Sequence, residues 1–86
     1  DLAIVVAEDV LWADVEACVL ASADETLESI EPFDVYRGDP IPAGHKSIAF
    51  SLTFRRADAT LTSEEAEQAR QTILDALRDE LNAELR

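Results

Sequence analysis

The chain has 86 residues, of which 19 are acidic and 7 are Lys or Arg, and its formal net charge is −12. This length leaves room for one domain, and the excess of acidic residues argues against a general binder of nucleic acids or of anionic membranes. Because 48% of the residues are hydrophobic, the chain can form a core and is not expected to be disordered.

The first two predicted elements are a strand and a helix. Residues 2–7 form a short apolar run with β-branched residues at its centre, which predicts a central strand. Residues 11–23 have apolar side chains at helical spacing and predict an amphipathic helix with Asp9 as its N-cap. Trp12 is expected to be a packing residue. The predicted buried face of the helix comprises Leu11, Val15, Cys18, Val19 and Ser22.

Two further strands are predicted in the middle of the chain. Residues 26–37 are interrupted by Pro32, which cannot donate a backbone hydrogen bond and therefore predicts an edge strand or a bulge. Residues 38–44 hold both glycines and two of the three prolines, which predicts a loop. Residues 46–55 alternate strictly, which predicts a strand with one face in the core. The core side chains of this strand are Ile48, Phe50, Leu52 and Phe54.

The last predicted elements are a long helix and a short strand. Thr62 and Glu65 have the spacing of a capping box, so a helix is expected to begin there and to end near Asn82. Residues 83–86 can add a final strand. The apolar face of the helix comprises Ala66, Ala69, Ile73, Leu77 and Leu81.

The order βαββαβ predicts an α+β fold of the ferredoxin-like type. In this sandwich a four-stranded antiparallel sheet carries both helices on one face. The first and third strands are central, and the second strand, which contains Pro32, lies at an edge. The other face of the sheet is open to solvent or to a partner.

The open face has one aromatic side chain. If Phe33 and Val35 point into the core, alternation places Asp34 and Tyr36 on the open face. A tyrosine ring beside small polar groups is typical of sheets that stack a nucleobase and bind its edge. An ordinary solvent-facing strand with a cross-strand tyrosine explains the same pattern. The neighbouring strand contributes Ser47, Ala49, Ser51, Thr53 and Arg55 to this face.

The basic residues are concentrated in the middle of the chain. Between residues 36 and 57 there is a single acidic residue, Asp39. This stretch can bind phosphates, or it can protect an edge strand from aggregation. The acidic residues lie mostly on and beside the predicted helices, where a solvated outer face is the simplest interpretation. The four basic residues of the stretch are Arg37, Lys46, Arg55 and Arg56.

No catalytic residue, metal or cofactor is predicted in this domain. His45 lies in a loop, where an exposed ring is expected, and Cys18 lies on an apolar helix face, where an inert buried thiol is expected. One Cys and one His cannot form a four-ligand zinc site, and no phosphate-binding or calcium-binding loop is present. No apolar run is long enough to cross a bilayer, so no membrane contact is expected. The single cysteine favours a cytoplasmic location.

Several segments resemble one known family. They are FDVYRG at 33–38, IPAGHKSIAF at 41–50, TLTSEE at 60–65 and ELR at 84–86. In this order they are similar to the C-terminal ferredoxin-fold anticodon-binding domain of the bacterial phenylalanyl-tRNA synthetase beta subunit. The opening DLAIVV is similar to the first strand of that domain. Because the chain also lacks methionine, we expect residues 1–86 to be one domain excised from the C-terminal part of a longer chain.

The resemblance implies a non-catalytic module that recognises a tRNA anticodon. The resemblance implies that Asp34, Tyr36, Ser47 and Ala49 contact the anticodon and that its first base stacks on Tyr36. We expect Asp34 and the Ser47 hydroxyl to bind the edge of that base, and Ala49 to allow its close approach. Arg55 is expected near the RNA backbone. The implied partners are the anticodon of tRNA(Phe), the remainder of the beta subunit and the alpha subunit of an alpha2-beta2 ligase. The parent enzyme, an aminoacyl-tRNA synthetase, is implied to use ATP and magnesium.

The chain departs from the family at Ala59, where an arginine is usual, so one candidate phosphate contact is missing. Two other functions fit a ferredoxin-like fold. One is a regulatory module that binds a small metabolite or dimerises through its edge strand, and the other is a module whose open sheet docks against protein. A metabolite-binding module needs a glycine-bearing loop and an apolar interface pocket, and the sequence shows neither clearly.

Overall fold

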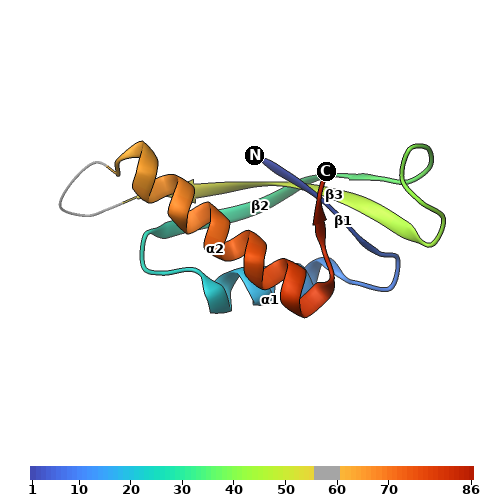
Figure 1. Ribbon diagram of the computed structural model, residues 1–86, viewed down its shortest axis with the longest axis horizontal. Helices are drawn as coiled ribbons and strands as arrows, with labels where there is room; N and C mark the ends of the chain where they lie inside the picture. The colour runs from blue at the N-terminus through green and yellow to red at the C-terminus, as the bar shows by residue number, and fades with distance from the viewer. Residues whose placement is uncertain (56–60) are drawn as a thin grey trace.

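The computed structural model describes residues 1–55 and 61–86. Ala59, where the family usually has arginine, and Arg56 lie outside the described residues. The described residues form helices and strands in the predicted order βαββαβ (Figure 1). They are β1 (Leu2–Ala7), α1 (Trp12–Ser22), β2 (Leu27–Tyr36), β3 (His45–Phe54), α2 (Ser63–Leu81) and β4 (Glu84–Leu85).

The four strands form one antiparallel sheet in the order β2-β3-β1-β4. The two central strands are β1 and β3, and the edges are β2 and β4, as predicted. Both helices lie against the same face of this sheet (Figure 1). The ferredoxin-like α+β fold is therefore confirmed, and in the described part of the chain one face of the sheet carries no helix.

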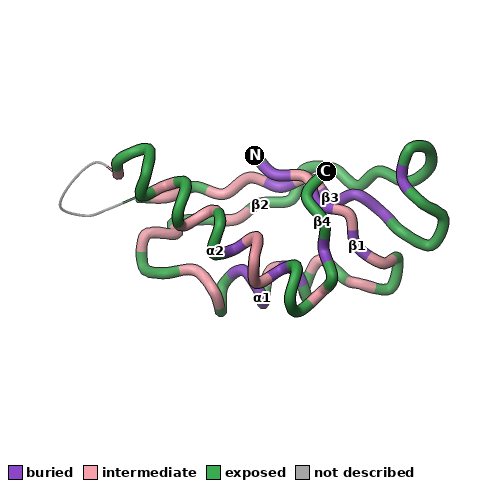
Figure 2. The backbone as a smooth tube through the Cα atoms, in the orientation of Figure 1, coloured by how far each residue is buried: buried purple, intermediate pink, exposed green. Residues whose placement is uncertain are grey.

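The core lies between the two central strands and the helices, where Figure 2 shows buried residues on all four elements. Register explains which side chains meet there, because Leu2 lies opposite Phe50 and Ile4 opposite Ile48. The Trp12 ring lies 5.6 Å from the Phe50 ring, between centroids, so the predicted packing role of Trp12 is confirmed. The helices contribute Val15, Cys18, Val19, Ile73 and Leu77 to the buried cluster.

The first helix begins later than its predicted cap. Asp9 lies in the turn that follows β1, and the N-cap residue is Leu11. The Leu11 backbone N–H donates to the Asp14 carboxylate over 2.9 Å, so an acidic side chain in the first turn replaces the expected Asp9 cap. Leu11 itself is 61% exposed and does not join the buried face, because it precedes the helix.

The prediction that Phe33 and Val35 enter the core was wrong. They are 60% and 48% exposed, respectively. A register shift between Pro32 and Asp34 leaves Phe33 without a partner on β3, so the alternation of the strand is interrupted there. Val35 does lie opposite Ile48, but β2 is the edge strand, and Figure 1 shows this end of it running beyond the helices. The predicted bulge or edge position of Pro32 is thereby confirmed.

The second helix has the predicted capping box. The Glu65 backbone N–H donates to the Thr62 hydroxyl, and the Thr62 N–H donates to the Glu65 carboxylate, both over 3.1 Å. The helix ends at Asn82, whose φ of 53° is left-handed and reverses the chain toward β4. Among the residues that the structure describes, no helix has the length and apolarity needed to cross a membrane.

Candidate functional site

The strand register brings four of the predicted site residues together on the open face. Tyr36 on β2 lies directly opposite Ser47 on β3, and Asp34 lies directly opposite Ala49. Directly opposed residues of antiparallel strands share a face, with Cβ atoms about 5 Å apart. The bulge at Pro32 precedes both pairs and leaves their register intact. These two pairs therefore form a contiguous group of side chains, which we call the open-face site.

Small side chains extend the open-face site across the central strand β1. Ala3 lies opposite Ala49, and Val5 lies opposite Ser47. Alternation places all four of these residues on the face that carries no helix. The Tyr36 ring thus lies at the edge of a surface of short side chains, and a planar nucleobase can approach the sheet closely there.

The Tyr36 side chain is held at both ends. Its backbone is paired with Ser47 in the sheet, and its hydroxyl donates to the Asp39 carbonyl oxygen over 2.6 Å. The loop can return toward the ring because Gly38 has a φ of +98°, which side chains other than glycine rarely adopt. Tyr36 is 41% exposed. A fixed and accessible ring is suited to stacking.

A fifth residue, Arg86, completes the open-face site and was missed by the sequence analysis. Its Cζ atom lies 5.2 Å from the centroid of the Tyr36 ring, and its Nη1 donates to the Ser47 hydroxyl over 3.4 Å. The sequence signal that could have found it is the alternation of the expected final strand at 83–86, in which Leu85, opposite Ile4 on the helix-covered face, precedes Arg86. Alternation then places Arg86 on the open face.

Exposure differs sharply among the four predicted residues. Asp34 is exposed and Ala49 is partly exposed, in agreement with their expected access to a ligand. Ser47 is on the predicted face but is only 1% exposed. Its hydroxyl is the acceptor for Arg86 Nη1, and the direct contact expected between Ser47 and a base stays a prediction.

Arg55 does not belong to the open-face site. It follows the far end of β3, eight residues beyond Ser47, and at about 3.3 Å per residue this corresponds to about 26 Å. Its guanidinium lies 3.3 Å from the Glu28 carboxylate. A contact between Arg55 and an RNA backbone therefore has to occur well away from the Tyr36 ring, and it stays a prediction.

The predicted basic stretch does not form one free patch. Arg37 pairs with Glu8 at 2.7 Å, and its guanidinium holds the pKa of the Glu8 carboxyl below the usual value. Lys46 lies opposite Val6 on the helix-covered face and is 8% exposed. Among the described basic residues of this stretch, Arg37 and Arg55 are each paired with a carboxylate and Lys46 is buried, which agrees better with edge protection than with a continuous phosphate-binding surface.

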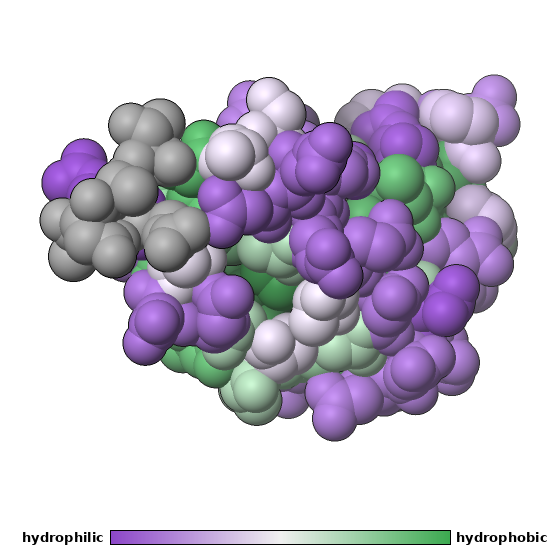
Figure 3. Space-filling view, turned by 60° about the vertical axis from the view of Figure 1, so that its left-hand side comes forward, coloured by the Kyte–Doolittle hydropathy of each residue, from purple (hydrophilic) through white to green (hydrophobic). Residues whose placement is uncertain are grey.

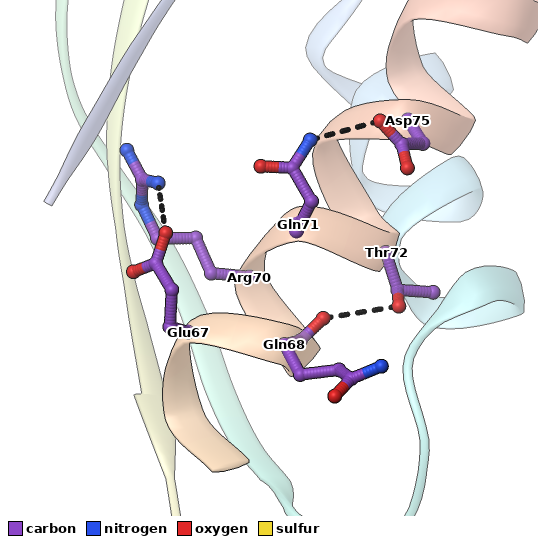
Figure 4. Close-up of polar contacts among 6 residues, drawn as sticks. All are labelled: Glu67, Gln68, Arg70, Gln71, Thr72 and Asp75. Atoms are coloured by element: carbon purple, nitrogen blue, oxygen red, sulfur yellow. Dashed lines mark hydrogen bonds and ion pairs between the residues drawn. The ribbon is translucent and has the colours of Figure 1, made fainter. Parts of the chain in front are cut away.

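The outer face of α2 is occupied by contacts within the helix itself. Figure 4 shows Arg70 paired with Glu67, and Gln71 donating to Asp75 one turn further along. The Thr72 hydroxyl donates to the Gln68 carbonyl oxygen in the same region. Such i to i+3 and i to i+4 contacts are typical of a solvated helix face.

A cleft lies at the end of the molecule opposite the Tyr36 ring. It is bounded by Phe54 at the end of β3, by residues 22–26 and by the first turns of α2. Figure 3 turns this end toward the reader and shows apolar atoms below a rim of hydrophilic residues. Phe54 is seven residues from Ser47 along β3, so this cleft is separate from the open-face site.

The described residues contain no group of three or more His, Cys, Asp or Glu side chains that could hold a metal ion. His45 is exposed, and its Nδ1 lies 3.2 Å from the Ala43 carbonyl oxygen. Cys18 is buried and does not form a disulfide.

Cys18 is expected to be almost unreactive in the folded chain. Burial, together with the Glu80 carboxylate that accepts from its Sγ at 2.9 Å, raises the pKa of the Cys18 thiol to about 12. Compared with an ordinary thiol of pKa about 8.5, the reactive thiolate fraction at pH 8 is about a thousandfold smaller. Alkylation by iodoacetamide, followed by mass spectrometry, should be correspondingly slower in the folded chain than in urea. Equal rates would contradict the buried, hydrogen-bonded thiol.

Comparison with known proteins identifies the family. A model of the ferredoxin-fold anticodon binding domain matches residues 1–86. The phenylalanine–tRNA ligase beta subunit of Corynebacterium glutamicum is 46% identical over 86 residues, which is 100% of this chain and 10% of that protein. The corresponding subunit of Streptomyces avermitilis is 48% identical over the same share of both chains. That of Shouchella clausii is 42% identical and is covered to 11% of its length. The chain thus spans about a tenth of the curated relatives that it matches.

Proposed function

The chain belongs to the family of ferredoxin-fold anticodon binding domains, and from this premise we propose that its open-face site binds the anticodon of a tRNA. One observation carries the proposal: Tyr36 and Asp34 lie directly opposite Ser47 and Ala49 on the face that has no helix. The ring stacks the first anticodon base, the Asp34 carboxylate accepts hydrogen bonds from the edge of that base, and Ala49 leaves room for it.

The identity of the relatives supports a specific partner. They are phenylalanine–tRNA ligase beta subunits, so the anticodon is that of tRNA(Phe), and the protein partners are the rest of the beta subunit and the alpha subunit of an alpha2-beta2 enzyme. Aminoacylation, with its ATP and magnesium, takes place outside these 86 residues, in the cytoplasm. The domain contributes recognition and no active site of its own.

The charge of the domain sets the strength of binding. With a net charge of −12, the chain gains little from general attraction to phosphates, so discrimination depends on the few contacts at the open-face site. A specific nucleic-acid interface normally buries about 1,000 Å² or more of protein surface. The open-face site is smaller than this, and the isolated domain is expected to bind weakly and selectively.

The proposal is tested by titrating the chain into two fluorescent RNA hairpins. One is the anticodon stem-loop of tRNA(Phe), and the other differs only in the first anticodon base. Recognition by the open-face site predicts tighter binding to the first hairpin at every salt concentration, because base contacts do not depend on phosphate charge. Equal affinities for the two hairpins would show that the sheet does not distinguish the base, and the proposal would fail.

A further inference from the structure

Arg86 differs from the other arginines that the structure describes. Each of the others is paired with a carboxylate, whereas Arg86 contacts the Ser47 hydroxyl and the Tyr36 ring. In a chain with 19 acidic residues, an arginine without an acidic partner is unexpected. Within the described ranges, the one arginine whose guanidinium has no carboxylate partner lies in the open-face site. The paired arginines are Arg37 with Glu8, Arg55 with Glu28, Arg70 with Glu67 and Arg78 with Asp75.

The backbone of Arg86 is anchored independently of its side chain. Its N–H donates to the Ala3 carbonyl oxygen over 2.8 Å, next to the pairing of β4 with β1. From there the side chain crosses the small residues of β1 toward Ser47 and Tyr36. Strands β4 and β2 are the two edges of the sheet, about 14 Å apart at the usual strand spacing. A long side chain is needed to join them, so shortening it removes the contact without removing the backbone hydrogen bond.

Ser47 is arranged to hold the guanidinium. The residue is 1% exposed, and its hydroxyl accepts from Arg86 Nη1. No buried side-chain nitrogen or oxygen in the described part of the chain lacks a hydrogen-bond partner. A nucleotide that approaches the Tyr36 ring therefore meets the guanidinium before it meets the Ser47 hydroxyl.

The guanidinium retains the groups that a nucleotide requires. A guanidinium carries five N–H donors in a planar fork, and one of them is used by Ser47, so four remain. These donors suit acceptor atoms of a base edge or a phosphate oxygen, and the plane itself can stack. Arg86 is exposed, so the donors are accessible.

We propose that Arg86 binds the nucleotide that stacks at Tyr36, and that Ser47 acts on the RNA through Arg86 as a positioning residue. The inference rests on the proposed anticodon-binding function. It adds a contact from Arg86 to the nucleotide and assigns Ser47 the role of holding Arg86 in place. It replaces the direct hydrogen bond between the Ser47 hydroxyl and the base with a bond from the Arg86 guanidinium.

The test is a double-mutant cycle on the 86-residue chain, with the tRNA(Phe) anticodon stem-loop as the probe. Arg86→Ala is expected to weaken binding about tenfold, because it removes charge-assisted hydrogen bonds to the nucleotide. Ser47→Ala is expected to weaken binding about threefold in the wild-type chain and not at all in the Arg86→Ala background, since coupled residues are not additive. Arg78→Ala, which removes the same charge from α2, and Ser51→Ala, on the same face of β3, are the matched controls.

Two results would overturn the inference. One is an affinity of Arg86→Ala for the stem-loop that equals or exceeds that of the wild type. This would mean that the guanidinium does not bind the nucleotide, or that it blocks access to the Tyr36 ring. The other is an equal loss from Ser47→Ala in both backgrounds, which would restore the direct contact between Ser47 and the base.

Further measurements distinguish a phosphate from a base edge as the group that Arg86 binds. They also distinguish failure of this inference from failure of the proposed function. If Arg86 binds a phosphate, Arg86→Ala should reduce the slope of log affinity against log salt by about 0.7. If it binds a base edge, the slope should stay constant and the preference for the correct first base should fall. If Tyr36→Ala weakens binding and Arg86→Ala does not, the inference fails while the proposed function stands. If the wild type does not distinguish the two hairpins, the proposed function itself fails.

Discussion

Replacing Tyr36 by alanine is expected to weaken binding of the anticodon stem-loop by about 1 to 3 kcal/mol, or about 5-fold to 150-fold. Tyr36 is 41% exposed, its ring is fixed by the hydrogen bond from its hydroxyl to Asp39, and it is the one aromatic side chain that the register places among the residues of the open-face site. Removing it also releases the Arg86 guanidinium from its ring contact. The loss is measured by fluorescence anisotropy with the labelled hairpin.

Tyr36→Phe is the matched control for this prediction. It keeps the stacking surface and the contact with Arg86 and loses the hydrogen bond to the Asp39 carbonyl oxygen. Binding should stay within a few fold of the wild type, because stacking depends on the ring. An affinity of Tyr36→Ala that equals that of the wild type, in a chain shown by circular dichroism to be folded, would refute a stacking role.

Replacing Phe50 by alanine is expected to lower the free energy of unfolding by about 3 to 5 kcal/mol. The Phe50 side chain is 0% exposed, lies opposite Leu2 on the central strand pair and is in contact with the Trp12 ring. Because native domains are stabilised by only about 5 to 15 kcal/mol in total, the variant should lose a large share of its stability. Urea unfolding followed by circular dichroism measures the change.

Thr53→Ala provides the control for the core variant. Thr53 is exposed on the same strand, opposite Ser29, and its replacement should change the free energy of unfolding by less than about 0.5 kcal/mol. A cost below about 1 kcal/mol for Phe50→Ala would mean that Phe50 is not central to the core. It would also cast doubt on the register of β1 against β3.

Local signals in the sequence were sufficient to predict the elements. Strict alternation located β3, the Thr62–Glu65 spacing located the start of α2, and Pro32 identified the edge strand. Each of these signals acts over a few residues and needs no knowledge of distant contacts. The order of the elements then left few topologies, because the ferredoxin-like sheet is a common solution for βαββαβ.

The burial of β2 could not be predicted from the same signals. Alternation says which residues share a face, but it does not say how far a helix covers that face. Val35 has the expected orientation and is still 48% exposed, and the bulge at Pro32 removes Phe33 from the pairing. The exposure of these two apolar residues follows from the lengths and positions of the helices, which are properties of the tertiary structure.

The open-face site was predictable only within one hairpin. Asp34, Tyr36, Ser47 and Ala49 belong to two strands that are adjacent in sequence, so parity alone placed them together. Arg86 directly follows a two-residue strand at the opposite edge of the sheet, and its side chain reaches the site across β1. The reach of the Arg86 side chain across β1 is not visible in a local sequence pattern.

Chemical-shift mapping of the isotope-labelled chain with the anticodon stem-loop of tRNA(Phe) tests the central claim most directly. The account predicts that the largest shifts in two-dimensional NMR spectra cluster at Asp34, Tyr36, Ser47, Ala49 and Arg86 and weaken with the first-base variant. Shifts that centre on the outer face of α2, or that are identical for both hairpins, would contradict anticodon recognition by the open sheet.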